Sequence, residues 1–367
     1  MLIGIQPDRM GEQSYSEKWS VFLQDCGVDF EFIDLLGLED LSLLRRYDGI
    51  MWRWDLSHPW RQVAPRILDA IEKELRIPVY PDYNTRWPWD DKIKQHYLLG
   101  IHGIRTPRTW IFWHREDARN WIRETEFPKI FKLAVGASSR NVVLVNDRRE
   151  ASRLVDRMFS RGISTAERLD EVKSGRILRP FARNVRGRLF ARHRYEESRR
   201  KAIIEKNYAY FQEFVPGNPW DTRVTVIGDS AFGFRRINRP GDFRASGSGR
   251  IDFDRTRVDL RMVEHAFSIS EKLKVDCMAY DFLKDKKGEI LLLEMCWTFA
   301  DSAVQKCPGH WDRSLAWHPG SAWAEEFQIK EFLARIRSGC RPGPPGPHTS
   351  GQVEPGKPME KRNGIEA

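Results

Sequence analysis

The sequence predicts an α+β protein that begins with an open α/β sheet. Strand-like and helix-like segments alternate over residues 1–90, as they do in open, mostly parallel sheets. Beyond this region, apolar runs of strand length are joined by short polar turns, which is typical of hairpins. A length of 367 residues leaves room for two or three domains.

The first region contains alternating strand and helix candidates. Strands are expected at residues 2–8, 28–35, 47–54 and 77–82, and helices at residues 16–26 and 65–75. Because ligands bind at the carboxyl ends of strands in such sheets, a cleft is expected among three loops. These loops are residues 6–11, 52–60 and 81–89. The Trp-rich segment WRWDLSHPW (52–60) could form a platform for a sugar or an aromatic ring, although interface packing is the favoured interpretation.

A second α+β region of domain size follows. Asp90 and Asp91 open a helix, where acidic residues suit the positive end of the helix dipole. Further helices are expected at 116–125 and 148–159, and strands at 104–113, 127–136 and 142–146. A loop of small residues, 134–141, connects the last two strands, and Lys132 precedes it.

The third region is expected to hold a hairpin, a Gly/Ser-rich loop, a helix and a strand pair. RVTVIGDSAFGFRR (223–236) should form the hairpin, with Gly228 and Asp229 at its tip. The loop is expected at residues 240–250, and the helix at residues 258–273.

Two acidic residues interrupt the apolar strand pair that follows, at residues 277–283 and 289–297. A buried charge is costly unless it is paired or binds a metal. Asp281 and Glu294 could therefore hold Mg²⁺, which takes carboxylate oxygens and keeps positions for nucleotide phosphates. Taken alone, the acid pair favours the alternative, in which both carboxylates pair with arginines.

Composition excludes several classes of protein. No apolar run approaches the ~20 residues that a membrane span requires, so no membrane segment is expected. The N-terminus lacks the basic start and apolar core of a signal peptide, and a cytoplasmic location is expected. The five scattered cysteines contain no C-x-x-C pair, which indicates neither a disulfide framework nor a zinc site.

The net charge of +9 raises the question of nucleic acid as a partner. Arginine supplies most of the excess, and it suits phosphates and carboxylates of small substrates equally well. Because no zinc-finger, RRM, KH or basic-zipper pattern is present, nucleic-acid binding is not expected as the main function. Residues 176–201 are expected to form a solvated basic helix or hairpin, with an anion-binding flap as the alternative. Residues 341–367 are rich in Pro and Gly and should be disordered.

The loop after Lys132 matches neither G-x-x-x-x-G-K-[ST] nor G-x-G-x-x-G, but the order of motifs along the chain is more informative. It resembles the ATP-grasp superfamily, most closely the carboxylate–amine ligases that include the ribosomal-protein S6 glutamate ligase. The resemblance runs from about residue 90 to residue 297. The matching segments are DDKIKQHYLLGIHGIRTPRT (90–109), FPKIFKLAVGASSRNV (127–142), YFQEFVPG (210–217), DTRVTVIGD (221–229) and GDFRASGSG (241–249).

This resemblance implies an ATP-grasp fold, in which two α+β subdomains clamp ATP. The subdomains would be residues 91–210 and 211–338, with an α/β domain at 1–90 and a tail at 339–367. The nucleotide-binding residues implied are Lys92, Lys132, Ser138, Glu213, Phe214, Asp221 and Arg244. The implied metal ligands are Asp281 and Glu294, for Mg²⁺ or Mn²⁺. The implied catalytic residues are Arg223, Arg236 and Arg244, of which Arg244 or Arg236 would hold an acyl phosphate.

The sequence departs from the family pattern at two positions. Cys296 stands where the family usually has a metal-binding Asn, and Ser246 stands where the related loop has Asn. A thiol is a poor ligand for Mg²⁺, which prefers oxygen. The metal site is therefore expected to be weaker, completed by water, or lost.

The resemblance implies an enzyme, an ATP-dependent carboxylate–amine ligase that forms an amide through an acyl phosphate and releases ADP. The alternatives are an ATP-grasp kinase or other phosphotransferase, and a nucleotide-binding module without turnover, which Cys296 suggests. The expected partners are small-molecule carboxylate and amine substrates, and a homodimer is left open. The first domain and residues 299–317 are expected to recognise the acceptor.

Overall fold

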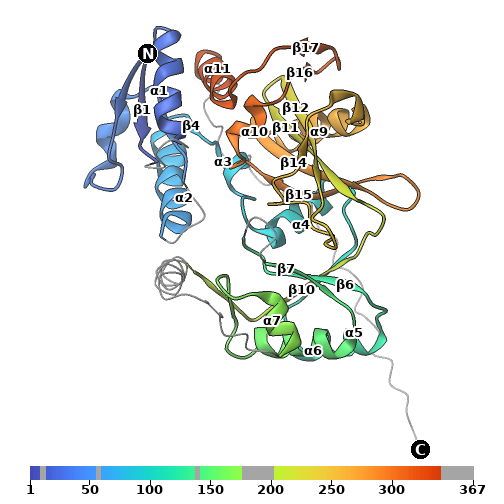
Figure 1. The fold of residues 1–367 in the computed structure, drawn as a ribbon. Helices are drawn as coiled ribbons and strands as arrows, with labels where there is room; N and C mark the ends of the chain where they lie inside the picture. The colour runs from blue at the N-terminus through green and yellow to red at the C-terminus, as the bar shows by residue number, and fades with distance from the viewer. Residues whose placement is uncertain (9–13, 55–58, 137–140, 176–201, 340–367) are drawn as a thin grey trace, which may run out of the picture.

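The chain folds into two lobes (Figure 1). The computed structural model describes residues 1–8, 14–54, 59–136, 141–175 and 202–339. Figure 1 shows the first described segments (blue) and the last ones, up to residue 339 (orange and red), together in one lobe, and the middle of the chain (green) in the other. Some earlier predictions fall wholly or partly outside the described ranges: the loop at 6–11, the Trp-rich segment at 55–58, the loop at 134–141 with Ser138, the basic segment 176–201, and the tail from residue 340.

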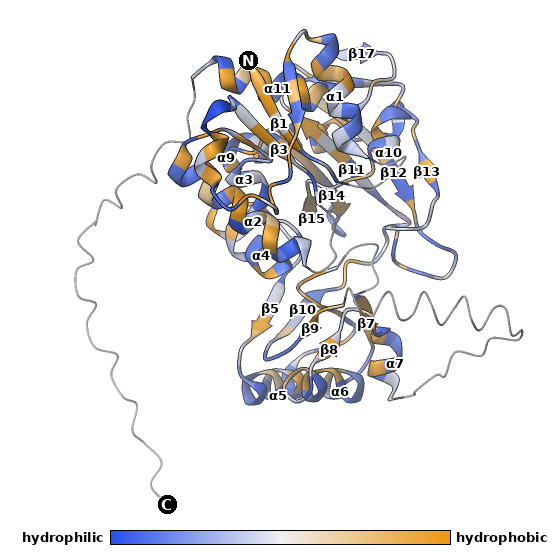
Figure 2. Cartoon of the chain, turned by 90° about the vertical axis from the view of Figure 1, so that its left-hand side faces the viewer, coloured by the Kyte–Doolittle hydropathy of each residue, from blue (hydrophilic) through white to orange (hydrophobic). Residues whose placement is uncertain are grey.

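The first sheet is parallel, as predicted, with strand order β2-β1-β3-β4. Its strands are β1 (Leu2–Gln6), β2 (Asp29–Phe32), β3 (Gly49–Trp52) and β4 (Val79–Tyr80). The helices are α1 (Tyr15–Asp25), α2 (Trp60–Ala70) and α3 (Tyr83–Arg86), with a 3₁₀ turn at Leu41–Arg46 and a π turn at Ile71–Leu75. The predicted helix at 65–75 thus starts earlier than expected and holds Pro65 in its interior. In Figure 2, β1 is mostly apolar along its length, as a buried parallel strand should be.

The second lobe is built on an antiparallel sheet with strand order β5-β10-β6-β7. Helix α4 (Lys92–Ile101) leads to β5 (Thr109–Phe112), β6 (Lys129–Lys132), β7 (Val142–Val145) and β10 (Ala209–Glu213). Helices α5 (Arg115–Glu124) and α6 (Arg148–Met158) share one apolar core with this sheet. The sequence analysis did not predict β8 (Ile163–Ser164), α7 (Leu169–Ser174) or β9 (Ile204–Glu205).

The third sheet has the strand order β15-β14-β11-β12-β16-β17, with β13 paired to β12. The predicted hairpin is present as β11 (Trp220–Ile227) and β12 (Ser230–Ile237), and Gly228 at its tip has φ 56°. The predicted strand pair is β14 (Cys277–Lys284) and β15 (Ile290–Cys296), and α9 (Leu260–Leu273) precedes it. The remaining elements are β13 (Ile251–Asp252), a 3₁₀ turn at Arg255–Arg257, α10 (Asp301–Gln305), β16 (Gly309–Asp312), β17 (Trp317–Pro319) and α11 (Ala324–Arg337).

The C-terminal helix α11 packs on the first sheet, far from it in sequence. Phe332 and Leu333 of α11 share a core with Ile3 and Ile5 of β1 and with Trp19 of α1. The backbone of β3 approaches α11 so closely that glycine is required there. A Cβ at Gly49 would lie 2.6 Å from Phe332 Cζ and 2.8 Å from Ile336 Cδ1. Packing thus joins the predicted N-terminal domain to the C-terminal part of the chain, and the boundaries at residues 90 and 210 stay predictions.

Replacing Gly49 with Ala should destabilise the protein by about 1–3 kcal/mol, because the added methyl overpacks the contact with α11. Gly100 of α4 is a matched control, since a Cβ there meets no atom within 4 Å. Gly100→Ala should instead stabilise by up to about 1 kcal/mol through helix propensity. Urea unfolding of the variants measures both effects. Equal midpoints for the two variants would contradict the close packing of α11 on β3.

Among the described residues, none of the helices combines the length and the apolar character needed to cross a membrane.

Candidate functional site

A cleft between the two lobes collects most of the residues that the sequence analysis assigned to a site. Its walls come from β6 and β10 on one side and from β11, β12, β14 and β15 on the other. The predicted residues that line it are Lys92, Lys132, Glu213, Phe214, Asp221, Arg236, Arg244, Asp281 and Glu294. Of the other two, Arg223 is bonded to Asp281 from the neighbouring strand, and Ser138 lies outside the described residues.

The first turn of α4 delivers Lys92 to the cleft. Asp91 caps this helix by accepting hydrogen bonds from Ile93 N (3.1 Å) and Lys94 N (3.0 Å). Lys92 Nζ donates to Gly136 O (3.1 Å) and lies 3.2 Å from Glu294 Oε1. Burial disfavours the ammonium, but Glu294 and other acidic neighbours hold the pKa of Lys92 above its ordinary value. Lys92 is therefore a fixed positive charge beside Glu294.

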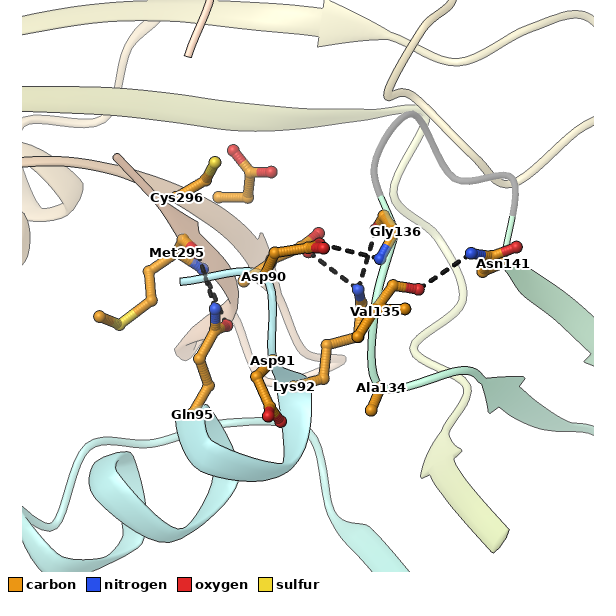
Figure 3. Close-up of polar contacts among 12 residues, drawn as sticks. Asp90, Asp91, Lys92, Gln95, Ala134, Val135, Gly136, Asn141, Met295 and Cys296 are labelled. Atoms are coloured by element: carbon orange, nitrogen blue, oxygen red, sulfur yellow. Dashed lines mark hydrogen bonds and ion pairs between the residues drawn. The ribbon is translucent and has the colours of Figure 1, made fainter. Parts of the chain in front are cut away.

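Asp90 organises the same corner, although the sequence analysis gave it no role in the site. Its Oδ1 accepts a hydrogen bond from Gly136 N (2.8 Å), as Figure 3 shows. On its other side, Arg61 Nη2 donates to Asp90 O (2.8 Å), and Arg61 Nε lies 3.4 Å from Asp90 Oδ2. Asp90 has φ 48°, a left-handed conformation that no sequence pattern predicted. It thereby links α2 of the first lobe to the start of the small-residue loop.

Lys132 is the second ammonium in the cleft, at the end of β6. The residue is only 5% exposed, and its ammonium forms no hydrogen bond or ion pair within the described part of the chain. Burial lowers the pKa of Lys132 to about 8, and the positive charge of Lys92 acts in the same direction, whereas Glu294 opposes it. A buried cation in this state is stabilised by an anion that enters the cleft.

Two arginines and two aspartates form a network across β11, β12 and β14. Strand register sets Asp221 opposite Arg236 and Arg223 opposite Asp281. Arg223 Nε and Nη2 donate to the two oxygens of Asp281 (2.7 and 2.9 Å). Arg236 donates to both oxygens of Asp221 (2.7 and 2.5 Å) and to Asp281 Oδ2 (2.6 Å). Arg236 thus bridges two buried carboxylates.

The network keeps Asp281 ionised, whereas burial outweighs Arg236 at Asp221 and raises the pKa of that carboxyl. Burial alone would raise the pKa of Asp281, but Arg223 and Arg236 hold it at about 2. The pairing of Asp281 with arginines, which the acid pair alone favoured, is therefore present in the structure. Three donors occupy the oxygens of Asp281, which leaves about one of its roughly four lone-pair positions for another ligand.

Glu294 and Cys296 lie at the end of β15. Glu294 stands opposite Asp281 in the strand register, and its side chain is 32% exposed. Cys296 Sγ lies 3.4 Å from Thr298 Oγ1, and burial raises the pKa of the thiol, so it stays protonated near neutral pH. Within the described ranges, no three His, Cys, Asp or Glu side chains are grouped to hold a metal.

Contacts between the two lobes close the cleft near the end of β10. Phe214 follows β10 and packs edge-on against Phe243 of the Gly/Ser-rich loop, with ring centroids 5.8 Å apart. Arg244 Nη2 pairs with Asp242 Oδ2 (2.7 Å), and Arg244 Nη1 donates to Val142 O (3.1 Å). Because Val142 begins β7 of the second lobe, Arg244 spans the cleft.

The segment that carries Lys92 and Lys132 is similar to a known family of domains. Residues 89–177 match the model of the RimK-like ATP-grasp domain. The alpha-aminoadipate–LysW ligase LysX of Saccharolobus solfataricus is 22% identical over 230 residues, which cover 62% of this chain and 69% of that relative.

Solved structures resemble the whole described fold at low sequence identity. D-alanyl-alanine synthetase A from Vibrio cholerae has a TM-score of 0.57 and 11% identity, covering 92% of this chain and 98% of its own. The ATP-grasp ligase PsnB, complexed with minimal precursor, Mg and ADP, has a TM-score of 0.51 and 12% identity, covering 92% and 98%. At these identities the likeness concerns the fold.

Proposed function

Because the chain has the ATP-grasp fold and matches the RimK-like domain over residues 89–177, we propose that it is an ATP-dependent carboxylate–amine ligase. One observation carries the proposal. Lys132 is a buried cation that forms no ion pair with any described residue, although the charge of Glu294 acts on it, and Lys92 lines the same cleft between the lobes. Two buried ammonium groups in one cleft suit the charge of a triphosphate. The relative LysX is a ligase by name, and the structurally similar D-alanyl-alanine synthetase A is a synthetase by name.

The proposed reaction has two steps. A carboxylate oxygen of the first substrate attacks the γ-phosphorus of ATP, the bond to the β-phosphate oxygen breaks, and ADP leaves. The amine of the second substrate then attacks the carbonyl carbon of the acyl phosphate. The carbon–oxygen bond to phosphate breaks, and the nitrogen loses a proton as the amide forms. Neither step requires a protein nucleophile, so positioning and charge neutralisation are the tasks of the protein.

The cleft residues divide these tasks. Lys92 and Lys132 neutralise the phosphates, and Glu213 and Phe214 at the end of β10 contact the base. Asp221 gives one lone pair of each oxygen to Arg236 and keeps others for a ribose hydroxyl. Arg244, which already reaches across the cleft to Val142, would hold the acyl phosphate.

A divalent cation fits these residues only in part. Glu294 offers one carboxylate oxygen that Lys92 does not contact, and Asp281 offers about one lone pair. Such a pair suits Mg²⁺, which binds through one or two carboxylates and takes its remaining ligands from phosphates and water. Bound there, the cation would neutralise phosphate charge. The protonated thiol of Cys296 adds no ligand.

A nucleotide-binding module without turnover is the second candidate, and the same corner favours it. Asp281 is nearly saturated by arginines, and Cys296 supplies a neutral thiol where an oxygen ligand would help. The two candidates differ in the Mg²⁺-dependent turnover that they predict for Cys296→Asn, a variant with an oxygen ligand at this position.

Purified protein incubated with ATP, Mg²⁺, pooled amino acids and small carboxylates should release ADP and phosphate. Release of AMP and pyrophosphate alone would contradict the acyl-phosphate mechanism. Cys296→Asn should lower the Mg²⁺ concentration needed for half-maximal turnover, since an amide oxygen is a better ligand for Mg²⁺ than a thiol. Nucleotide binding without turnover in both proteins would favour the second candidate. Cys307→Asn is not a suitable control because Cys307 is buried in a core, so the exposed Cys26→Asn serves instead.

A further inference from the structure

Gly136 lies at the start of the small-residue loop, and one short segment of the chain, residues 90–92, binds both of its polar backbone groups. Asp90 Oδ1 accepts a hydrogen bond from Gly136 N (2.8 Å), and Lys92 Nζ donates to Gly136 O (3.1 Å). Gly136 has φ 115°, and a Cβ there would clash with Asn141 Nδ2, so glycine is required. A carboxylate and an ammonium thus hold the backbone from which the loop departs.

Asp90 connects this backbone to the first lobe through its second carboxylate oxygen. Arg61 of α2 has its Nε 3.4 Å from Asp90 Oδ2, and its Nη2 donates to Asp90 O (2.8 Å). The described residues that line the cleft between the lobes include Lys92 and Gly136 but not Asp90, which is 8% exposed. Asp90 therefore has one carboxylate oxygen on each lobe and does not itself line the cleft.

Helix α4 is also fixed to the strand that carries Glu294. Gln95, which is 4% exposed, donates from Nε2 to Met295 O (2.8 Å) and accepts at Oε1 from Met295 N (3.3 Å). In Figure 3 this pair lies on one side of the start of α4, and Gly136 lies on the other. The start of α4 therefore fixes Lys92 between Glu294 and Gly136.

The conformation and the charge of Asp90 both cost folding free energy. Its φ of 48° is left-handed, which aspartate adopts more readily than most residues but less readily than glycine. Burial raises the pKa of its carboxyl, and the charges of Lys92 and Arg61 oppose this effect. Costly backbone conformations persist where the surrounding contacts impose them, and they are concentrated at functional sites. At a residue that does not line the cleft, these costs indicate a role that depends on the contacts of Asp90.

We propose that Asp90 is a positioning residue of the active site, which holds Gly136 and Lys92 in place for the phosphates of ATP and is itself held by Arg61. This inference rests on the proposed ligase function. Phosphoryl transfer depends on where charge is placed around the phosphates, and a displacement of about 1 Å can slow such a reaction about 100-fold. Asp90 controls that placement from outside the cleft, because Asp90 and Lys92 share Gly136 as a partner.

Asp90→Ala should lower kcat for ADP release by about 10- to 100-fold, because the ammonium groups of the cleft remain but Lys92 is misplaced. The affinity for a non-hydrolysable ATP analogue should fall much less than kcat, since the charges that bind the phosphates are unchanged. Asp90→Asn should recover most of kcat, because its amide oxygen still accepts from Gly136 N and asparagine also tolerates a positive φ. Rates are measured below the melting temperature of each variant, so that lost stability alone leaves kcat unchanged. Equal losses in kcat and in affinity, or no recovery in Asp90→Asn, would contradict the positioning role.

A second pair of variants tests whether Arg61 acts through Asp90. Arg61→Met should lower kcat by less than Asp90→Ala does, because the bond from Asp90 to Gly136 remains. The double variant Arg61→Met/Asp90→Ala should be no slower than Asp90→Ala alone, since the two residues act in series. Arg66→Met is the matched control, because Arg66 is exposed on the same helix, and it should keep the wild-type kcat. Independent, additive losses would show that Arg61 does not act through Asp90.

Hydrogen exchange at the Gly136 amide, followed by NMR on protein with isotopically labelled glycine, reports the contact without turnover. The amide should exchange slowly in the wild type and in Asp90→Asn. It should exchange about tenfold faster or more in Asp90→Ala, where its hydrogen-bond acceptor is lost. The same exchange rate in Asp90→Ala and in the wild type would overturn the inference whatever the kinetics.

These measurements separate the role of Asp90 from the proposed function. If the wild type releases ADP and Asp90→Ala has the same kcat, the positioning role is wrong and the ligase proposal stands. If no substrate pool supports ADP release, but exchange at Gly136 depends on Asp90 with the ATP analogue bound, Asp90 positions the loop and the ligase proposal fails.

Discussion

Lys132→Met should lower kcat/KM for ATP by about 100-fold or more, the magnitude typical for removal of one preorganised group that stabilises developing charge. Lys132 is buried, and its ammonium forms no hydrogen bond or ion pair with a described residue. We therefore expect a phosphate group of ATP to be its partner. Steady-state turnover and the affinity for a fluorescent ATP analogue measure the loss. Lys129→Met is the matched control, because Lys129 lies on the same strand but packs over the Trp110 ring instead of lining the cleft. Equal losses in the two variants would refute the assignment.

The same residue predicts how nucleotide affinity changes with pH. Burial lowers the pKa of Lys132 from 10.5 to about 8, so the ammonium loses its proton as the pH rises through about 8. Affinity for ATP should therefore fall above this pH, and binding should take up protons. The contribution of Lys132 to folding stability changes with pH in the direction opposite to the affinity for ATP. Between the two pKa values the unfolded chain binds more protons than the folded chain, so the contribution of Lys132 to stability rises with pH over this window. Lys132→Met should be more stable than the wild type at pH 7, and the difference should shrink above pH 8.

The sequence was sufficient for the parallel strands of the first sheet and for the long hairpin. Alternating strand and helix segments indicate the former, and a two-residue tip at Gly228 and Asp229 determines the register of the latter. That register also places Asp221 opposite Arg236, so this pair could have been predicted from the hairpin alone. The pairing of Arg223 with Asp281 could not, because β11 and β14 are distant in sequence and their register depends on the whole sheet.

Two other features escaped sequence analysis for physical reasons. Helix α11 buries Glu325 and Gln328 with its apolar residues, and polar residues on the buried face obscure the helical periodicity. Asp90 shows the second reason. Its role depends on a positive φ and on a bond to Gly136, and both result from the packing of α4 against the loop. Charged residues that line the cleft, such as Lys92 and Lys132, could be predicted from motifs. Residues that fix the conformation of its backbone, such as Asp90, could not.

Arg236→Met should destabilise the protein by about 3–5 kcal/mol, since it leaves two buried carboxylates without the cation that bridges them. Arg223 still pairs with Asp281, but Asp221 loses the ion-pair partner that the structure shows for it. Arg235 on the same strand is the control, because it stacks on Trp220 outside the network. Urea unfolding at pH 7 compares the two variants. A loss in Arg236→Met no larger than in Arg235→Met would contradict the bridging role.

Lowering the pH should reduce the difference in unfolding free energy between the wild type and Arg236→Met. The direction of this change follows from the pKa of Asp281. Folding lowers that pKa from 3.8 to about 2, so Asp281 contributes its full stability above the unfolded value and loses it as the pH falls toward 2. Burial raises the pKa of Asp221, so the acid-dependent loss comes from Asp281. In Arg236→Met the carboxylates are less well paired and accept protons more readily, which relieves the buried charge. The difference in unfolding free energy between wild type and Arg236→Met should therefore narrow between about pH 5 and pH 3.

Adding Asp221→Asn to Arg236→Met should recover part of the stability, because a neutral amide tolerates burial without a cation. If the double variant is no more stable than Arg236→Met alone, the cost lies in packing around Arg236 and not in the unpaired charge.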